Sequence, residues 1–185
     1  MTKEEKYLAR IIFKSKIYQS DKQSFEDLFT RVKQNENSNF KQIKPQGSLG
    51  DGKCDGFNAS SEEYYQVYAP EELTGNESTL LSKMDSSITG LMKFWKEKGF
   101  KVSKFYYVVK DDYKNVYALL YTNAKENAKK YSIECEILTC KDIEDTFLKL
   151  DEDEIIEIIG IIPDPLNIDN VEYGVMEEVI DFLLK

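Results

Sequence analysis

Apolar residues recur at spacings of three and four over the first part of the chain, which predicts helices. The pattern runs from Glu4 to about Lys33 and is interrupted near Ser20, so we expect two successive helices. Residues 35–39 are polar and predict a loop, and residues 40–43 predict the start of an extended segment. Residues 45–56 are rich in glycine and predict tight turns.

The rest of the chain alternates patterns typical of strands and helices. Residues 64–68 predict a strand, residues 76–99 give the clearest helix, and the apolar run 102–109 predicts a central strand covered on both faces. Further elements are expected as a helix over 113–130, a strand over 133–139 and helices over 143–150, 155–159 and 173–184. This order predicts one α/β domain, residues 1–185, with a mixed sheet flanked by helices and with 151–185 as a helical C-terminal extension.

Composition narrows the class of protein. A length of 185 residues suits a single domain, and the chain contains no histidine, which excludes histidine-based acid–base catalysis. Three cysteines without metal-ligand spacing argue against a zinc site and predict a reducing cytoplasm: Cys54, Cys135 and Cys140. No apolar stretch approaches the ~20 residues that cross a bilayer, so no membrane association is expected.

Charge is distributed unevenly along the chain. The net charge of −9 argues against a protein dedicated to binding nucleic acid, because phosphate contacts need clustered cations. Residues 144–157 are strongly acidic, and they are explained most simply as a solvated face. A solvated helix end likewise explains a group of lysines at positions 93, 96, 98, 101 and 104.

The candidate chemistry lies around the glycine-rich turn. Asp51 and Asp55 flank it, and a strand containing Gln66 follows, so Asp55 and Gln66 are expected side by side at one edge of the sheet. Together with Glu26 on a preceding helix, Asp51 and Asp55 would offer the oxygen ligands that Mg²⁺ or Mn²⁺ accepts. Asp and Gly also tolerate left-handed geometry, so a purely structural turn explains the same residues.

Residues 25–68 resemble the core of Mrr-type PD-(D/E)XK restriction endonucleases. The family pattern is a helical Glu, then G-D-G-G-x-D, then Q-x-K, and the resemblance implies a restriction-endonuclease-like fold with a metal-dependent DNase site. The matching positions are Glu26 for the helical acid, Gly50-Asp51-Gly52 for the turn, Asp55 for the metal-binding acid and Gln66 for the amide. The departures are Tyr68 where the catalytic lysine belongs and Lys53 in place of a turn glycine.

A longer stretch resembles the C-terminal modules of bacterial ABC-three-component anti-phage systems. These modules carry F-x-x-(I/V)-x-P-x-G-x-x-G-D-x-x-x-D-G followed by Q-V-Y-A-P-E, which here begins at Phe40 and ends at Glu71. In that pattern Tyr68 is a family feature. The resemblance implies a protein partner in a defence complex.

Three hypotheses remain open. The leading one is a catalytically degenerate module that recognises a partner protein or nucleic acid, through a site formed by Glu26, Asp55, Gln66 and Tyr68. The first alternative is an active Mg²⁺-dependent DNase whose catalytic lysine has moved to Lys53, Lys83 or Lys93. The second is a structural assembly domain, and homo-oligomer formation is compatible with each.

Overall fold

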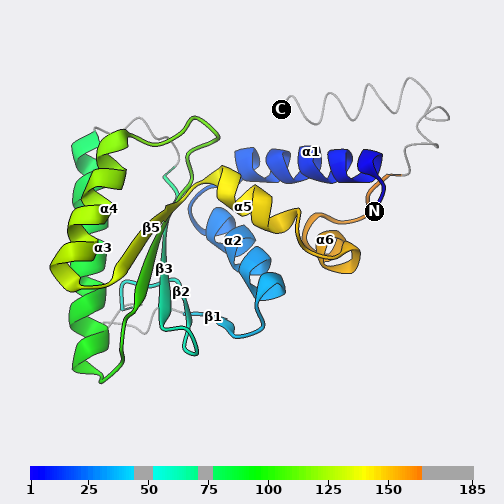
Figure 1. Ribbon diagram of the computed structural model, residues 1–185. Helices are drawn as coiled ribbons and strands as arrows, with labels where there is room; N and C mark the ends of the chain where they lie inside the picture. The colour runs from blue at the N-terminus through cyan, green and yellow to red at the C-terminus, as the bar shows by residue number, and fades with distance from the viewer. Residues whose placement is uncertain (44–51, 71–76, 164–185) are drawn as a thin grey trace.

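The computed structural model describes residues 1–43, 52–70 and 77–163, arranged as a sheet with helices on both faces (Figure 1). Asp51 and the predicted helix 173–184 lie outside these residues. The elements are α1 (Lys3–Gln19), α2 (Lys22–Glu36), β1 (Phe40–Gln42), β2 (Gly56–Asn58), β3 (Glu63–Tyr68), α3 (Glu77–Glu97), β4 (Lys104–Val109), α4 (Ala118–Tyr131), β5 (Glu134–Leu138), α5 (Cys140–Phe147) and α6 (Glu152–Ile159).

The two predicted N-terminal helices are present, with the break where the sequence places it. Thr2 caps α1, because its Oγ1 accepts a hydrogen bond from the Glu5 N–H at 3.1 Å while the Glu5 carboxylate accepts one from the Thr2 N–H. At the start of α2, Ser24 Oγ accepts from the Asp21 N–H at 2.8 Å. These local contacts satisfy N–H groups that the first turn of a helix leaves without partners.

The sheet has five strands in the order β1-β2-β3-β4-β5. β1–β2 and β2–β3 are antiparallel, whereas β3–β4 and β4–β5 are parallel and are connected through α3 and α4. The predicted α/β architecture with a mixed, helix-flanked sheet is therefore confirmed. Both faces of β4 are covered, as its continuous apolar run predicts, since Phe105 packs in one core and Val108 in the other.

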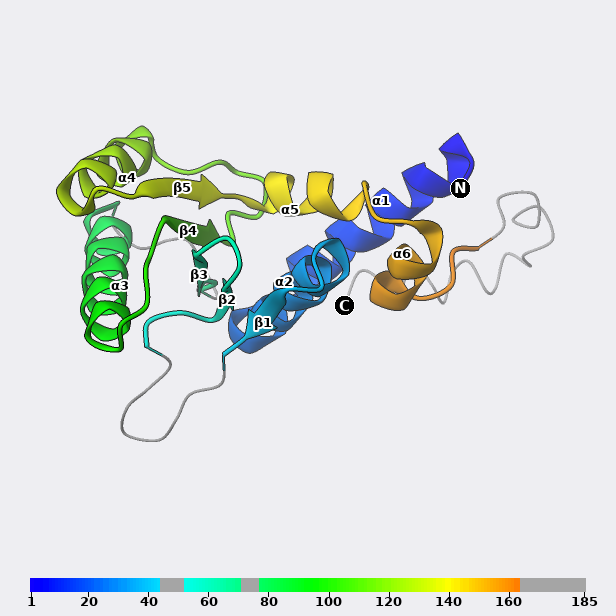
Figure 2. The same cartoon turned by 60° about the horizontal axis from the view of Figure 1, so that its bottom comes forward.

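The two cores lie on opposite faces of the sheet (Figures 1 and 2). On one face, helices α1, α2, α5 and α6 pack around Tyr65 of β3 and Val108 of β4. On the other face, α3 and α4 cover Tyr64 and Tyr107. The predicted helix 76–99 is α3, which packs a stripe of apolar residues against the sheet. Leu81 is partly buried, and the buried members are Leu80, Met84, Ile88, Leu91, Met92 and Trp95.

Several predicted boundaries are wrong. The helix expected from Tyr113 begins only at Ala118, because Asp111 Oδ2 accepts a hydrogen bond from the Asn115 N–H at 3.0 Å and holds a loop there. Asp112, Tyr113 and Asn115 have positive φ in this loop, which no helix allows. The helix expected from Ile143 begins at Cys140, since Thr139 and Asp142 form a capping box. The short strand β2 was not predicted as a separate element.

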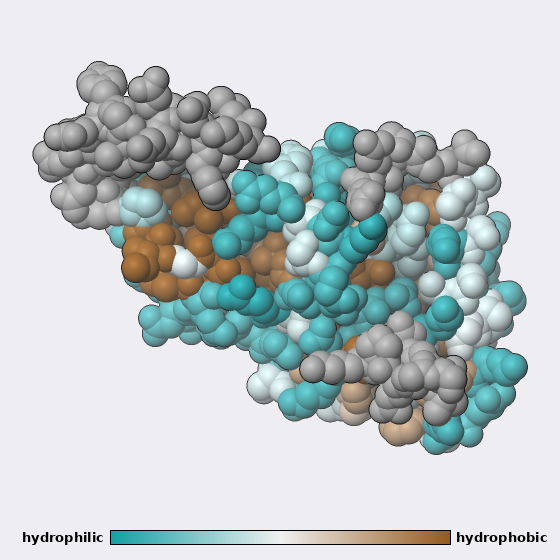
Figure 3. Space-filling model, turned by 180° about the vertical axis from the view of Figure 1, so that it is seen from behind, coloured by the Kyte–Doolittle hydropathy of each residue, from teal (hydrophilic) through white to brown (hydrophobic). Residues whose placement is uncertain are grey.

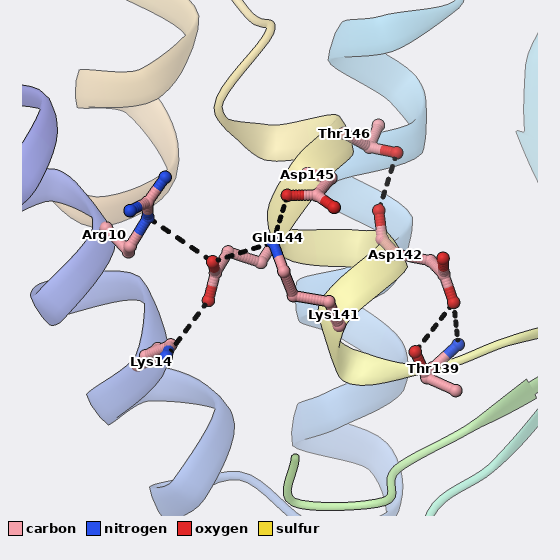
Figure 4. A network of polar contacts seen from close by, with 8 residues as sticks. All are labelled: Arg10, Lys14, Thr139, Lys141, Asp142, Glu144, Asp145 and Thr146. Atoms are coloured by element: carbon pink, nitrogen blue, oxygen red, sulfur yellow. Dashed lines mark hydrogen bonds and ion pairs between the residues drawn. The ribbon is translucent and has the colours of Figure 1, made fainter. Parts of the chain in front are cut away.

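A buried carboxylate fastens α1 to α5 (Figure 4). The side chain of Glu144 is 2% exposed and lies 3.4 Å from Arg10 Nε, 3.8 Å from Lys14 Nζ and 3.4 Å from Lys141 Nζ. A buried charge is tolerated only when opposite charges or hydrogen bonds compensate for lost hydration. Phe13 of α1 and Phe147 of α5 also stack, with ring centroids 4.1 Å apart.

The surface differs between the two ends of the molecule. On its back, apolar side chains gather toward α1 and α6, whereas the surface toward α3 and α4 is mainly hydrophilic (Figure 3). Ile11, Ile156 and Ile161 are among the exposed apolar residues. Within the described ranges, no helix combines the length and apolarity needed to span a bilayer.

All three thiols should react slowly in the native protein. Cys54 and Cys140 are fully buried, and burial raises the pKa of both the Cys135 and the Cys140 thiol to about 12. The thiolate is the reactive form, so labelling with a disulfide reagent at pH 8 should be slower than in the unfolded chain by a factor of at least about 10². Stopped-flow labelling with and without guanidinium measures this, and a thiol that reacts rapidly in the native state would contradict it.

Candidate functional site

Residues 52–56, the described end of the glycine-rich segment, pack against the last part of α3. Gly52 and Lys53 both have left-handed backbone conformations, with φ of +67° and +60°. A Cβ added at Gly52 would lie 2.7 Å from Cδ1 of Phe94, so the backbone packs directly against that ring. The buried Cys54 closes the turn by donating from Sγ to the Gly56 carbonyl at 2.8 Å. Both the left-handed geometry and the close contact require glycine at position 52.

Glycine is required at position 56 by a different packing contact. A Cβ at this position would lie 2.2 Å from Cζ of Phe40, whose ring crosses the backbone of β2. Phe40 also packs edge-on against Phe29 and Tyr65, with ring centroids 6.0 and 5.4 Å apart. Phe40 and Gly56 are therefore in direct contact in the structure, although they lie far apart in the sequence.

Asp55 sits between these glycines and is 8% exposed. Its backbone extends the ladder of β2: the Asp55 N–H donates to the Tyr65 carbonyl at 2.8 Å, and its carbonyl accepts from the Ile43 N–H at 2.9 Å. Its carboxylate Oδ2 accepts from Gln66 Nε2 and from the Val67 N–H, both at 2.6 Å. The structure thus places Asp55 and Gln66 side by side, as the sequence predicts.

The Gln66 amide leaves one acceptor without a donor. Its Nε2 is committed to Asp55, and its Oε1 is inaccessible to solvent and has no hydrogen-bond partner among the described residues. Buried acceptors normally find a donor, an ordered water or a cation. A carboxylate next to an amide oxygen is also the type of ligand pair that Mg²⁺ and Mn²⁺ accept.

Tyr68 lies two residues after Gln66 on the same strand, so the alternation of side chains places both on the α3 face. Its ring stacks on that of Tyr107 with centroids 6.1 Å apart and an interplanar angle of 16°. Burial raises the pKa of Tyr107 above its usual range, with nearby Tyr68 adding to the effect. A phenol carries no positive charge in any protonation state, so this position supplies none.

Glu26 and Asp51 are the other predicted metal ligands. Glu26 lies on α2, where its Oε1 accepts from Gln42 Nε2 of β1 at 3.4 Å. Asp51 falls outside the described residues. Within the part of the chain that the structure describes, no group of three or more Cys, Asp and Glu side chains is arranged to hold a metal ion. Asp55 and Gln66 are therefore the pair that the structure brings together.

The three lysines considered as replacements for a catalytic cation are all exposed. Lys53 lies in the turn two residues before Asp55, and its stem packs over Gly90, where an added Cβ would be 2.7 Å from Cγ of Lys53. Lys83 and Lys93 lie on α3. Of the three, Lys53 is nearest to Asp55 along the chain.

The sequence analysis missed a buried polar group directly after β4. The Lys110 side chain is 4% exposed and pairs with Asp112 Oδ1 at 2.5 Å, and the Lys110 N–H donates to the Tyr68 carbonyl. Asp111 is 1% exposed, and its Oδ1 accepts from the Cys140 N–H at 2.9 Å, at the start of α5. Three consecutive charged residues following an apolar strand were a signal that could have identified this group.

Comparisons with known proteins add no identification. No protein-family model matches the chain, and no similar curated protein or solved structure was found.

Proposed function

We propose that this protein is a catalytically degenerate PD-(D/E)XK-like module of a bacterial anti-phage defence system. The observation that carries the proposal is the contact between Asp55 and Gln66, with Tyr68 following on the same face of β3. Nucleases of this class place an acid on one strand, an acid or amide on the next, and a lysine two residues later. This chain has the first two groups and a tyrosine in the third position.

The restriction-endonuclease-like fold is part of the same proposal. It is supported by the position of Asp55 beside the antiparallel pair β2–β3 and by the helix carrying Glu26, which precedes them. It is also supported by the parallel strand β4 beside β3, which follows a helical crossover.

The defence assignment rests on the resemblance of residues 40–71 to modules of ABC-three-component systems. The packing of the described residues of this stretch, 40–43 and 52–70, is consistent with one structural unit. Phe40 fills the space that a side chain at position 56 would need, and the following acid and amide contact each other across the strands. The glycines and Phe40 would then support the loop, and Asp55 and Gln66 would serve recognition of a partner protein or nucleic acid.

A bound Mg²⁺ or Mn²⁺ fits the residues in part. Asp55 and the amide oxygen of Gln66 would hold it, and the metal would supply a positive charge that polarises a phosphate or another anionic group of the partner. Gln66 would then orient the ion through its oxygen while its nitrogen keeps Asp55 in place. Without a lysine, such a site binds anions without promoting their hydrolysis.

A structural assembly domain is the second candidate, because packing alone explains the glycines at positions 52 and 56, without any ligand. An active DNase with a relocated lysine is the third. Plasmid cleavage that disappears in Asp55→Ala would favour that enzyme.

Divalent metal should raise the melting temperature of the wild-type protein. A ligand at about ten times its Kd stabilises the folded state by about 1.4 kcal/mol, which corresponds to a shift of about 3–6 °C for a domain of this size. Calorimetry with millimolar Mg²⁺ or Mn²⁺ measures the shift, with NaCl at equal ionic strength as the control. Asp55→Ala should abolish it. Identical curves for wild type and Asp55→Ala, unchanged by metal, would instead favour the structural domain.

A further inference from the structure

Exposed lysines from two helices meet at one end of the molecule. α3 and α4 pack side by side and end before the parallel strands β4 and β5, so their C-terminal turns lie at the same end of the sheet (Figure 1). None of the described carboxylates forms an ion pair with the five lysines in or next to these turns. We call them the basic cluster: Lys93, Lys96, Lys98, Lys129 and Lys130.

Neighbouring lysines differ from this cluster because they are already neutralised. Lys101 Nζ lies 2.7 Å from Glu62, and Lys104 Nζ lies 3.2 Å from Glu134 and 2.7 Å from Glu136. The cluster therefore keeps its charge available in a protein whose net charge is −9. A local positive field on an acidic protein orients a negatively charged partner toward that one place.

The basic cluster borders an open groove of about 430 Å³. The groove is lined by Lys96 and Lys101, by the aromatic side chains of Phe100 and Tyr131, and by residues 99, 102, 132 and 133, with no acidic residue among them. Phe100 is 49% exposed although its ring is large and apolar. The ring packs against that of Trp95 at an interplanar angle of 85°, with centroids 5.2 Å apart, which holds it in place.

Polar contacts hold α3 against α4, and one of them involves Tyr131, which lines the groove. Thr89 Oγ1 and the Tyr131 hydroxyl are 2.9 Å apart, and Asn127 Nδ2 donates to Asp85 Oδ1 at 2.8 Å. Asn123 Nδ2 donates to the same oxygen at 3.0 Å. The groove is thus formed before any ligand binds, which lowers the entropic cost of binding.

We infer that this groove binds the phosphate backbone of a single-stranded nucleic acid, with a base stacked on Phe100. Lysine ammonium groups act as point charges for phosphates, and an exposed aromatic ring stacks on any base whose face is accessible. Bases of a duplex present no such face, which selects a single strand. The groove is separate from the contact between Asp55 and Gln66, and the inference does not depend on a metal site there.

Fluorescence anisotropy with a labelled oligothymidylate of twelve nucleotides tests this binding. If about three phosphates are contacted, the dissociation constant should rise about 20-fold between 50 and 200 mM NaCl, from a slope of about −0.7 per phosphate. The triple variant Lys96→Glu/Lys98→Glu/Lys130→Glu should weaken binding at least about tenfold and flatten the salt dependence. Phe100→Ala should weaken single-strand binding several-fold.

The matched control is Lys3→Glu/Lys6→Glu/Lys149→Glu, which changes the net charge equally at exposed positions outside the groove. It should bind within about twofold of wild type, and binding by the wild type should persist in EDTA, which separates this site from the proposed metal site. The inference fails if wild type does not bind at 50 mM NaCl or if both triple variants lose affinity equally. It also fails if an acidic peptide competes as well as the oligonucleotide, because the groove would then be a protein-binding surface.

Discussion

Supercoiled plasmid incubated with the wild-type protein and Mg²⁺ or Mn²⁺ should remain intact, whereas Tyr68→Lys should introduce weak, metal-dependent nicking. The lysine of a working site stabilises charge that develops on the phosphate, and a phenol with a reference pKa of ~10 supplies none. Loss of such preorganised stabilisation costs on the order of 10²–10³ in rate. Restoring the ammonium beside Asp55 and Gln66 should therefore give the largest functional gain available from one substitution.

Two further variants make this result specific. Tyr68→Gln removes the same ring without adding charge and should stay inactive, and Asp55→Ala added to Tyr68→Lys should abolish the nicking. Gel electrophoresis of plasmid topoisomers over time measures each rate. Wild-type cleavage that survives stringent purification and vanishes in Asp55→Ala would show that another cation acts, and Lys53 or Lys83 would be the first to replace.

Asp111→Ala should lower the free energy of unfolding by about 3–6 kcal/mol, because it removes two hydrogen bonds and hydrogen bonds to a charged group contribute about 1.5–3 kcal/mol each. The buried carboxylate accepts from the Cys140 N–H and from the Asn115 N–H. Alanine would leave both backbone donors without this acceptor, at the start of α5 and in the loop before α4. Urea denaturation followed by circular dichroism measures the change.

Asp111→Asn keeps the shape and one acceptor oxygen, so it should lose less stability than alanine. Asp145→Ala is the surface control: Asp145 is half exposed and pairs only with Lys141 among the described side chains. Exposed ion pairs contribute about 0–1 kcal/mol, so this variant should stay close to wild type. Equal stabilities for Asp111→Ala and Asp145→Ala would show that Asp111 does not hold the two segments.

Local chemistry was enough to predict much of the architecture. The apolar stripe of α3 and the apolar run of β4 identified these elements. A helix buried on one face has apolar residues every three or four positions, and a strand buried on both faces has a continuous apolar run. The proximity of Asp55 and Gln66 was also predictable. A turn-rich loop returns the chain to the adjacent strand, and the side-chain alternation of strands then fixes which residues face each other.

Only the tertiary structure decided the features that depend on distant contacts. The loop after Asp111 replaces a predicted helical turn because a carboxylate buried between segments outweighs local helix propensity. Gly56 is required by the ring of Phe40, sixteen residues earlier in the chain. The basic cluster joins lysines from two helices more than thirty residues apart, and the sequence showed only the lysines of the first. Residue spacing records which face an element buries, whereas the packing of one element on another determines which side chains converge.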